Sequence, residues 1–322
     1  VKISPPKAWI TNLSIVLDTD DEIVDKYYLY CLLNQEGLKE KLDSGASISQ
    51  ITISSLEPYK IVLPSFDEQK KRTDILKAYD NLIENNNRRI AILEDMAQSL
   101  YREWFVKFRY PGHENQTLIE SPLGAIPEGW EVKQIQDFGT VITGKTPSKK
   151  KEEYYSSKDV PFLKTPDMHG STFAVQIEDS LSIAGADSQK NKYIPKNSIC
   201  VACIGAKAGV VTLTADQVQT NQQINSVVLF DQKDREYFYL FAVSLHQKIH
   251  ALGSSGATMT NVSKGKFETI EVLKPSSEVM ERFSTAMKPV FDQIENLQRR
   301  NINLQNQRDM LLPKLISGKI EL

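Results

Sequence analysis

The chain contains an internal repeat, and this feature constrains its architecture more than any other. When the sequence is compared with itself at an offset of 211 residues, residues 44–104 align without a gap with residues 255–315. Such a long ungapped match is not expected by chance, so we predict that residues 1–111 are a second copy of residues 212–322. Matching pairs include Ser44-Gly45-Ala46 with Ser255-Gly256-Ala257, Ile83-Glu84-Asn85 with Ile294-Glu295-Asn296, and Arg88-Arg89 with Arg299-Arg300.

Each copy ends in the pattern of a long helix. Apolar residues recur at alternating spacings of three and four between residues 76 and 104 and between residues 287 and 315, which is the pattern of a heptad seam. Polar residues interrupt the seams at different layers, Asn86 in one and Asn301 and Arg308 in the other. We expect the two helices to pair within the chain as a long antiparallel coiled coil. The seam residues predicted to make this contact are Leu76, Ile83, Ile90, Leu93, Leu100, Ile294, Leu297, Leu304 and Leu311.

Two other pairings fit the same seam pattern, an ordinary helical hairpin and a zipper between two copies of the chain. A helix of 40 residues is about 60 Å long. An intramolecular pair of that length would hold the segments at its two ends at a fixed separation.

The composition is that of an ordinary globular protein. The 322 residues are 40% hydrophobic and 25% charged, with a formal net charge of −2, so any surface for nucleic acid must be local. The sequence contains no apolar run long enough to span a bilayer. Three cysteines make no disulfide framework, which favours a reducing, cytoplasmic location.

Residues 127–275 show mainly the patterns of strands and turns. We predict strands over residues 130–135, 198–204 and 225–230, and one amphipathic helix over residues 237–252. The apolar face of that helix would carry Phe238, Phe241, Leu245 and Ile249. The fold class is therefore α+β, a twisted sheet with long helices attached.

Two motifs that suggest chemistry have simpler interpretations. Residues 139–146 match the phosphate-loop pattern G-x-x-x-x-G-K-T, but Pro147 follows directly and disfavours a helix start at that point. Cys200 and Cys203 form a lone C-x-x-C, and on a strand their side chains would point to opposite faces. We predict no catalytic residue, no metal and no cofactor.

A basic turn at residues 145–151 is the best candidate for contact with DNA. It carries four lysines in seven positions and no apolar residue that would bury it. Lysines neutralise phosphates, and the amides of Asn221-Gln222 suit adenine edges. A solvated charged loop is the alternative. The predicted DNA-contacting residues are Lys145, Thr146, Ser148, Lys149, Lys150, Lys151, Lys164, Lys207, Asn221, Gln222, Ser254, Ser255 and Lys264.

Three segments together resemble one known family. Residues 124–130 (GAIPEGW) enter a strand, residues 144–148 (GKTPS) and 160–168 (VPFLKTPDM) follow, and a Ser-Gly-Ala turn with Pro275 precedes the final helix. This order resembles the target-recognition domains of the specificity subunits of type I restriction-modification systems. The resemblance covers essentially the whole chain.

The resemblance implies a non-catalytic subunit that binds double-stranded DNA and directs partner enzymes to a bipartite site. Target-recognition domains read the two halves, and the paired helices set the gap and dock methyltransferase subunits, through which restriction subunits join. We expect the end of a first recognition domain at 1–64, a spacer helix at 65–111, the intact domain at 112–275 and a second spacer helix at 276–322. The front of the first domain, about 100 residues by the repeat offset, would be missing, and a second specificity chain is then a possible partner.

Two other functions fit parts of the sequence. One is a scaffold whose coiled coil recruits proteins without reading DNA. The other is a nucleotide-hydrolysing enzyme that uses residues 139–146. Loss of nucleotide binding on Lys145→Ala would indicate the enzyme, whereas indifference to charge reversal at residues 149–151 would indicate the scaffold.

Overall fold

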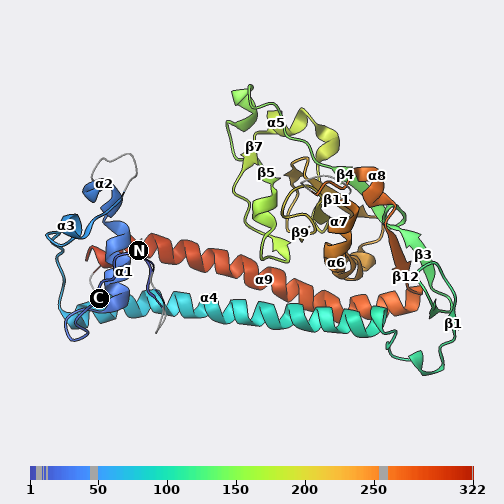
Figure 1. The fold of residues 1–322 in the computed structure, drawn as a ribbon, viewed down its shortest axis with the longest axis horizontal. Coiled ribbons are helices and arrows are strands. Elements are labelled where there is room, and N and C mark those ends of the chain that lie inside the picture. Colours follow the sequence, from blue (N-terminus) through green and yellow to red (C-terminus); the bar gives the residue numbers. More distant parts are fainter. Residues whose placement is uncertain (5–8, 10, 12–13, 44–49, 254–259, 321) are drawn as a thin grey trace. The chain divides into compact units, whose positions relative to one another are not determined.

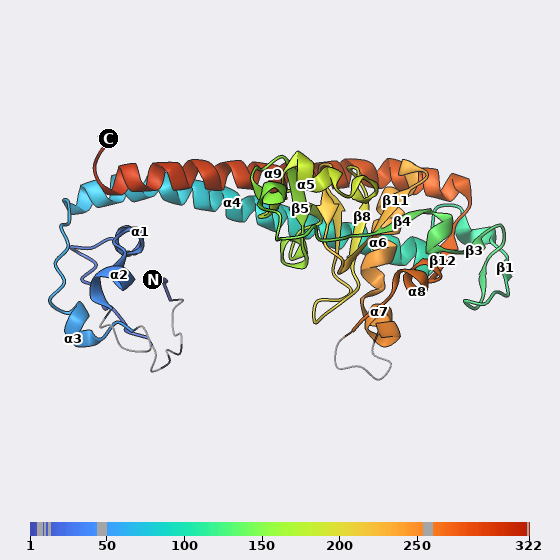
Figure 2. The same ribbon diagram turned by 90° about the horizontal axis from the view of Figure 1, so that it is seen from above.

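A computed structural model of the chain describes residues 1–4, 9, 11, 14–43, 50–253, 260–320 and 322. Contacts divide it into two compact units, Val1–Asn85 with Asn301–Leu322, and Asn86–Arg300. The long helices α4 (Phe66–Tyr101) and α9 (Ser277–Ile316) contribute to both units. Within each unit they lie side by side and run in opposite directions (Figures 1 and 2), as the seam pattern predicts.

The smaller unit is helical in its described residues. Its core joins α1 to the beginning of α4 and the end of α9, with Tyr28, Leu76 and Leu315 all buried. Gln69 of α4 is also buried, and its amide nitrogen donates to the carbonyl oxygens of Ile23 and Pro64. The helices that precede α4 are α1 (Lys26–Gln35), α2 (Leu38–Leu42) and α3 (Ile53–Leu56).

Several helices of the two units are spaced by the offset of the sequence repeat. The helix α3 begins at Ile53 and α8 at Lys264, which are 211 positions apart. The first residues of α4 and α9, Phe66 and Ser277, are separated by the same interval. These coincidences agree with the sequence repeat, which stays an inference from the sequence.

The predicted seam residues all lie on α4 or α9. In the smaller unit Leu76 and Ile83 are buried, and Leu304 and Leu311 are half-buried. In the larger unit the buried seam residues are Ile90, Ile294 and Leu297, and the half-buried ones are Leu93 and Leu100. The polar residues Asn86 and Asn301 are buried as well.

The first long helix begins and ends by identifiable local interactions. A capping box is present at its start, since the Ser65 hydroxyl accepts from the Glu68 amide at 3.4 Å and the Glu68 carboxylate accepts from the Ser65 amide at 3.3 Å. At its end lies a π-helical turn, Arg102–Val106, whose Trp104 and Phe105 pack against Phe283 of α9. The ring centroid of Phe283 is 5.5 Å from that of Trp104 and 4.7 Å from that of Phe105.

The larger unit contains a mixed five-stranded sheet in the order β4-β11-β8-β9-β6. All pairings are antiparallel except that of β6 with β9. Its strands are β4 (Gly139–Thr143), β6 (Phe173–Ala174), β8 (Ile199–Ala202), β9 (Val211–Thr214) and β11 (Ile224–Leu229). Two of them, β8 and β11, overlap the predicted strands over residues 198–204 and 225–230. The third predicted strand, over residues 130–135, contains a strand that lies outside this sheet. The sheet with its helices is the expected α+β fold.

Smaller elements complete the larger unit. A second sheet has the order β10-β5-β7, and two further pairs are β12-β3 and β1-β2. Their bounds are β1 (Leu118–Ile119), β2 (Ile126–Pro127), β3 (Glu131–Gln134), β5 (Val160–Leu163), β7 (Ser180–Leu181), β10 (Gln219–Thr220) and β12 (Glu271–Lys274). The shorter helices are α5 (Ile183–Asp187), α6 (Arg235–Ser244), α7 (His246–Gly253) and α8 (Lys264–Glu268).

Two hydrophobic cores cover the opposite faces of the five-stranded sheet. Ile199, Val201 and Cys203 belong to the core that includes α6 and the long helices, whereas Cys200 and Ala202 belong to the other core. Both cysteines are fully buried and carry free thiols. The prediction that the C-x-x-C side chains point to opposite faces is therefore confirmed.

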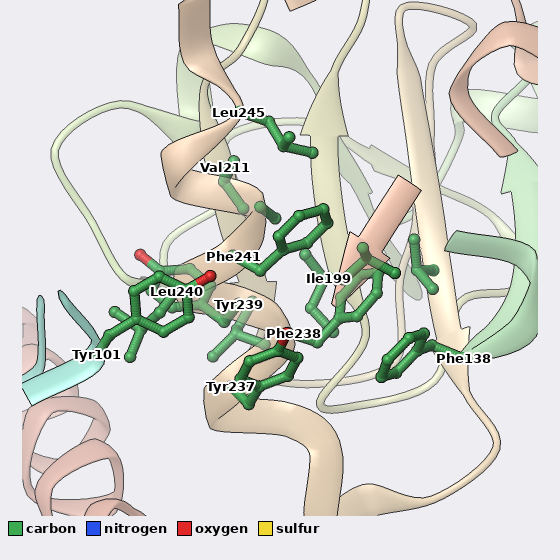
Figure 3. Close-up of a cluster of buried hydrophobic side chains, with 14 of the residues drawn as sticks. Tyr101, Phe138, Ile199, Val211, Tyr237, Phe238, Tyr239, Leu240, Phe241 and Leu245 are labelled. Atoms are coloured by element: carbon green, nitrogen blue, oxygen red, sulfur yellow. The ribbon is translucent and has the colours of Figure 1, made fainter. Parts of the chain in front are cut away.

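The expectation of a single amphipathic helix over residues 237–252 is wrong in two respects. The helix ends at Ser244 and resumes at His246, and α6 is buried on all sides instead of along one face. Phe238 packs against Phe138 at 5.3 Å between ring centroids, while Tyr237 packs against Tyr101 of α4 at 5.8 Å. Figure 3 shows α6 side chains directed both toward the sheet and toward α4. A helix between two apolar layers needs no polar face.

Candidate nucleic-acid interface

One end of the five-stranded sheet gathers most of the residues predicted to contact DNA. Thr143 at the end of β4 pairs with Asn225 of β11, and Ile224 at the start of β11 pairs with Ala202 at the end of β8. The loops that leave β4, leave β8 and enter β11 therefore all emerge at this end. They carry residues 145–151, Lys207 and Asn221-Gln222, which are distant in sequence.

The basic turn is anchored at its base and exposed at its tip. The Lys145 amide donates to the Thr220 carbonyl at 2.9 Å, and the Gln189 side-chain amide donates to the Lys145 carbonyl at 2.7 Å. The Tyr155 hydroxyl donates to the Pro147 carbonyl at 2.8 Å. Residues 148–151 project beyond these anchors and are exposed. Hydrogen bonds therefore hold the backbone at the base of the turn, and the lysine side chains at its tip are exposed to solvent.

The lysines of the turn are available as counter-charges. Among the described residues, no carboxylate lies within 4.0 Å of Lys145, Lys149, Lys150 or Lys207. Lys151 donates to the Tyr154 hydroxyl at 2.9 Å and lies over its ring at 4.9 Å from the centroid. The hydrogen bond to Tyr154 raises the pKa of Lys151, so this ammonium group stays charged.

Gln223, which was not among the predicted residues, joins several of these loops. Its side-chain Oε1 accepts from the Thr165 hydroxyl at 3.2 Å and from the Asn221 side-chain amide at 3.1 Å, and its backbone carbonyl accepts from the Cys203 backbone amide at 2.8 Å. Beside it, the Thr146 hydroxyl donates to Gln222 Oε1 at 2.7 Å. Only the proximity of Gln223 to Asn221 in the sequence could have indicated its role.

Gly144 allows the loops at this end of the sheet to approach closely. A Cβ on Gly144 would lie 2.1 Å from the Asn221 carbonyl oxygen and 2.3 Å from the Thr220 carbonyl oxygen. Real Cβ atoms do not approach backbone oxygens this closely, so glycine is required to bring the basic turn beside residues 220–222.

The remaining predicted residues differ in their surroundings. Lys164 is half-buried and forms an ion pair with Asp179, so part of its charge is already compensated. Lys264 begins α8 and pairs with Glu268 at 3.2 Å. An isolated bridge between Ile204 and Asn261 brings this segment to the loop after β8. Ser254 and Ser255, together with the Ser-Gly-Ala turn at 255–257, lie outside the described residues.

The segment that matches the phosphate-loop pattern is used for sheet contacts. Residues 139–143 form β4, and the next helical residues are Glu152–Tyr155. The amides of Gly144 and Lys145 donate to the carbonyl oxygens of Ile224 and Thr220. A phosphate cradle needs such amides free and a helix at the Lys-Thr pair, so this geometry does not suit nucleotide binding.

Comparison with known proteins shows the family. The sequence profile described as the type I restriction modification DNA specificity domain matches residues 1–95 and 127–306. The chain belongs to the type I restriction-modification DNA specificity family. It is thus a DNA-recognition subunit and not a catalytic one, as the resemblance in the sequence implies.

Individual relatives agree with this assignment. The chain is 31% identical, over 373 aligned positions, to the HindI specificity subunit of Haemophilus influenzae, and the match covers 97% of this chain and 81% of the relative. It is 26% identical to the MjaIX specificity subunit of Methanocaldococcus jannaschii, and this match covers 93% of the chain and 70% of the relative. The crystal structure of the S subunit from M. genitalium superposes with a TM-score of 0.58 at 16% sequence identity. The superposition covers 92% of this chain and 74% of that subunit, which shows a shared fold.

In this specificity-family chain, none of the helices within the described ranges is long and apolar enough to cross a lipid bilayer.

Proposed function

We propose that residues 112–275 of this specificity subunit read a DNA half-site with the loops at the β4, β8 and β11 end of the sheet. The topology of the sheet carries the proposal, because it gathers lysines and amides from three loops distant in sequence onto one surface. Lysines at this surface would neutralise phosphates and fix the register, while Thr146, Asn221 and Gln222 would contact base edges.

The same proposal assigns the long helices to partner binding. Methyltransferase subunits would dock on α4 and α9, and restriction subunits would join through them. The helix pair would also set the gap between two half-sites. A bipartite site needs two recognition modules, and a second copy of this chain is one source of the second module. A cytoplasmic location fits a protein of this function whose three cysteines are all free and buried.

Selection from a randomised duplex library tests DNA reading directly. The chain, with and without its methyltransferase subunit, is incubated with the library at several salt concentrations, and bound sequences are counted. We expect enrichment of a defined sequence, weakened by salt because phosphate contacts release counterions. A bipartite sequence would indicate two modules and a single half-site one module.

Charge reversal of the basic turn provides the decisive variant. Lys149→Glu with Lys150→Glu should abolish enrichment. The matched control is Lys60→Glu with Lys233→Glu, which makes the same change of charge at two exposed lysines outside these loops and outside the long helices. Enrichment that survives the first pair would contradict DNA reading by this turn. A complex with the methyltransferase that selects no sequence would instead support a scaffold.

A further inference from the structure

A cavity of about 350 Å³ lies inside the larger unit, between α4, α6 and α9. Its remaining walls are formed by His246 of α7 and by two loop segments that contribute Met168, Gly170, Ser171, Thr172 and residues 209–211. None of its lining residues was among the residues predicted to contact DNA. The cavity is lined by both long helices, which the proposed function assigns to partner binding.

A carboxylate without a cationic partner lines this cavity. Glu94 of α4 accepts a hydrogen bond from the Thr172 hydroxyl at 2.5 Å through Oε1. Among the described residues no lysine, arginine or histidine nitrogen lies within 4.0 Å of it, and Oε2 has no hydrogen-bond donor. Burial raises the pKa of the Glu94 carboxyl, while the hydrogen bond from Thr172 opposes this shift. Half-buried carboxylates are usually compensated by a cation.

The other walls suit a planar cation on an apolar stem. Tyr239 and Phe291 meet edge to face, with ring centroids 5.5 Å apart, and both are buried. Aliphatic side chains of α6, α9 and β9 form much of the remaining surface. A guanidinium group packs on aromatic rings and donates two parallel hydrogen bonds to a carboxylate, which an ammonium group cannot do. A DNA phosphate would be repelled by Glu94.

We propose that this cavity receives an arginine side chain of the methyltransferase subunit, with Glu94 as its carboxylate partner. The inference rests on the proposed function, in which α4 and α9 dock that subunit. The arginine stem would lie against the apolar wall, and its guanidinium would meet Oε1 and Oε2 of Glu94. The cavity would then fix the orientation of the partner through one charge-assisted pair.

Titration of the methyltransferase subunit into three variants of the full chain tests the proposal. Glu94→Gln keeps the shape and removes the charge, and it should raise Kd about tenfold or more. Glu271→Gln, at an exposed carboxylate of β12 outside both long helices, should leave Kd unchanged. Gln98→Arg places a cation one turn after Glu94 inside the same cavity. It should raise Kd while also raising Tm, a combination that a folding defect does not produce.

A competition experiment identifies the group that binds. N-acetyl-arginine methylamide should weaken the complex of the wild-type chain, whereas the citrulline analogue, its neutral isostere, should not. Equal Kd values for Glu94→Gln and the wild-type chain would overturn the cavity assignment while leaving the proposed function intact. Absence of any complex with the wild-type chain would overturn the docking of the methyltransferase, and this inference with it.

Discussion

Arg308 of α9 and Asp80 of α4 form an ion pair in the smaller unit, with Nη1 and Oδ1 2.6 Å apart. Arg308 occupies a position of the heptad seam where an apolar residue is usual. The other oxygen of Asp80 accepts a hydrogen bond from the Tyr27 hydroxyl of α1. Arg308 also contacts Asp309 on its own helix at 2.8 Å. One charged layer thus joins three helices.

Replacement of one partner of this layer should cost more stability than replacement of both. Arg308→Leu or Asp80→Leu alone should lower the free energy of unfolding by about 1–2 kcal/mol, because the half-buried charge that remains loses its partner across the helix pair. The double variant should recover part of the loss, since neither of the two charges is then left without the other and a leucine at position 308 fits the apolar seam. The free energies of unfolding of the wild-type chain, the two single variants and the double variant are measured by urea unfolding, followed by circular dichroism.

The neighbouring Asp309 provides the control for this cycle. Its side chain is 61% exposed, so Asp309→Asn should change the unfolding free energy by less than about 0.5 kcal/mol. If the double variant were less stable than either single variant, the layer would be a net source of stability, contrary to the expectation.

Gly144→Ala should separate the basic turn from residues 220–222. The added methyl group would lie on the Asn221 carbonyl oxygen, so the backbone must move, at a cost of about 1–3 kcal/mol. DNA affinity should fall with stability, because the two loops no longer share one surface. Thermal unfolding and duplex binding are measured on the same preparation.

Gly265→Ala is the matched control for this substitution. Gly265 lies on α8, and a Cβ there would meet no atom within 4 Å. Alanine should therefore stabilise the helix slightly, by up to about 1 kcal/mol, and leave DNA binding unchanged. Equal effects of the two substitutions would show that close approach at Gly144 is not the cause.

Much of the fold could be predicted from the sequence because its periodic features are strong. The seams of α4 and α9, the buried strand β8 and the capping box at Ser65 all follow from local patterns. The break between α6 and α7 and the burial of Arg235 and Glu236 could not be predicted. Those depend on α6 being enclosed by the sheet and the long helices, which is a property of packing.

The candidate site was predictable only in part. A run of lysines without large apolar neighbours is visible in a sequence, so the exposed tip of the basic turn, residues 148–151, could be predicted. Gln223 links the loops after β5, β8 and β10 by hydrogen bonds. This link could not be predicted, because it depends on the order of the strands in the sheets. The pairing of Glu94 with Thr172, 78 positions apart, has no sequence signal at all.

Glu94→Gln should alter the pH dependence of stability. Burial raises the pKa of Glu94 in the folded state, so the stabilising contribution of the protonated acid is present at low pH. That contribution is lost as the pH rises through the folded-state pKa. The glutamine variant should therefore be more stable than the wild-type chain near neutral pH, and the difference should shrink below about pH 4. Melting temperatures across this range measure the effect, and a difference that grows on acidification would contradict it.

The thiols of Cys200 and Cys203 should resist alkylation in the folded protein. Burial raises the pKa of each to about 12, so almost no thiolate is present at neutral pH. Iodoacetamide should label them only after unfolding, because the thiolate is the nucleophile. Mass spectrometry of native and urea-unfolded samples counts the labelled residues. Rapid labelling of either thiol in the native protein would show that the sheet opens readily around β8.

Lysine and glutamine substitutions in the loops proposed to read DNA should have different signatures. If Lys149 contacts a phosphate as proposed, Lys149→Ala should weaken binding to all duplexes alike and reduce the slope of log K against log salt by about one. Gln222→Ala removes a side chain that Thr146 orients through its hydroxyl. It should cost about 1–3 kcal/mol on the preferred sequence only, and so relax the preference at one base pair.

Binding to the selected duplex and to single-base variants of it, at three salt concentrations, separates these two effects. Thr146→Val should reproduce part of the Gln222→Ala relaxation, because it leaves Gln222 in place without its orienting hydrogen bond. A uniform loss of affinity from Gln222→Ala would assign that residue to the phosphate backbone. Base reading would then have to come from other residues at the same end of the sheet, with Asn221 as the next to test.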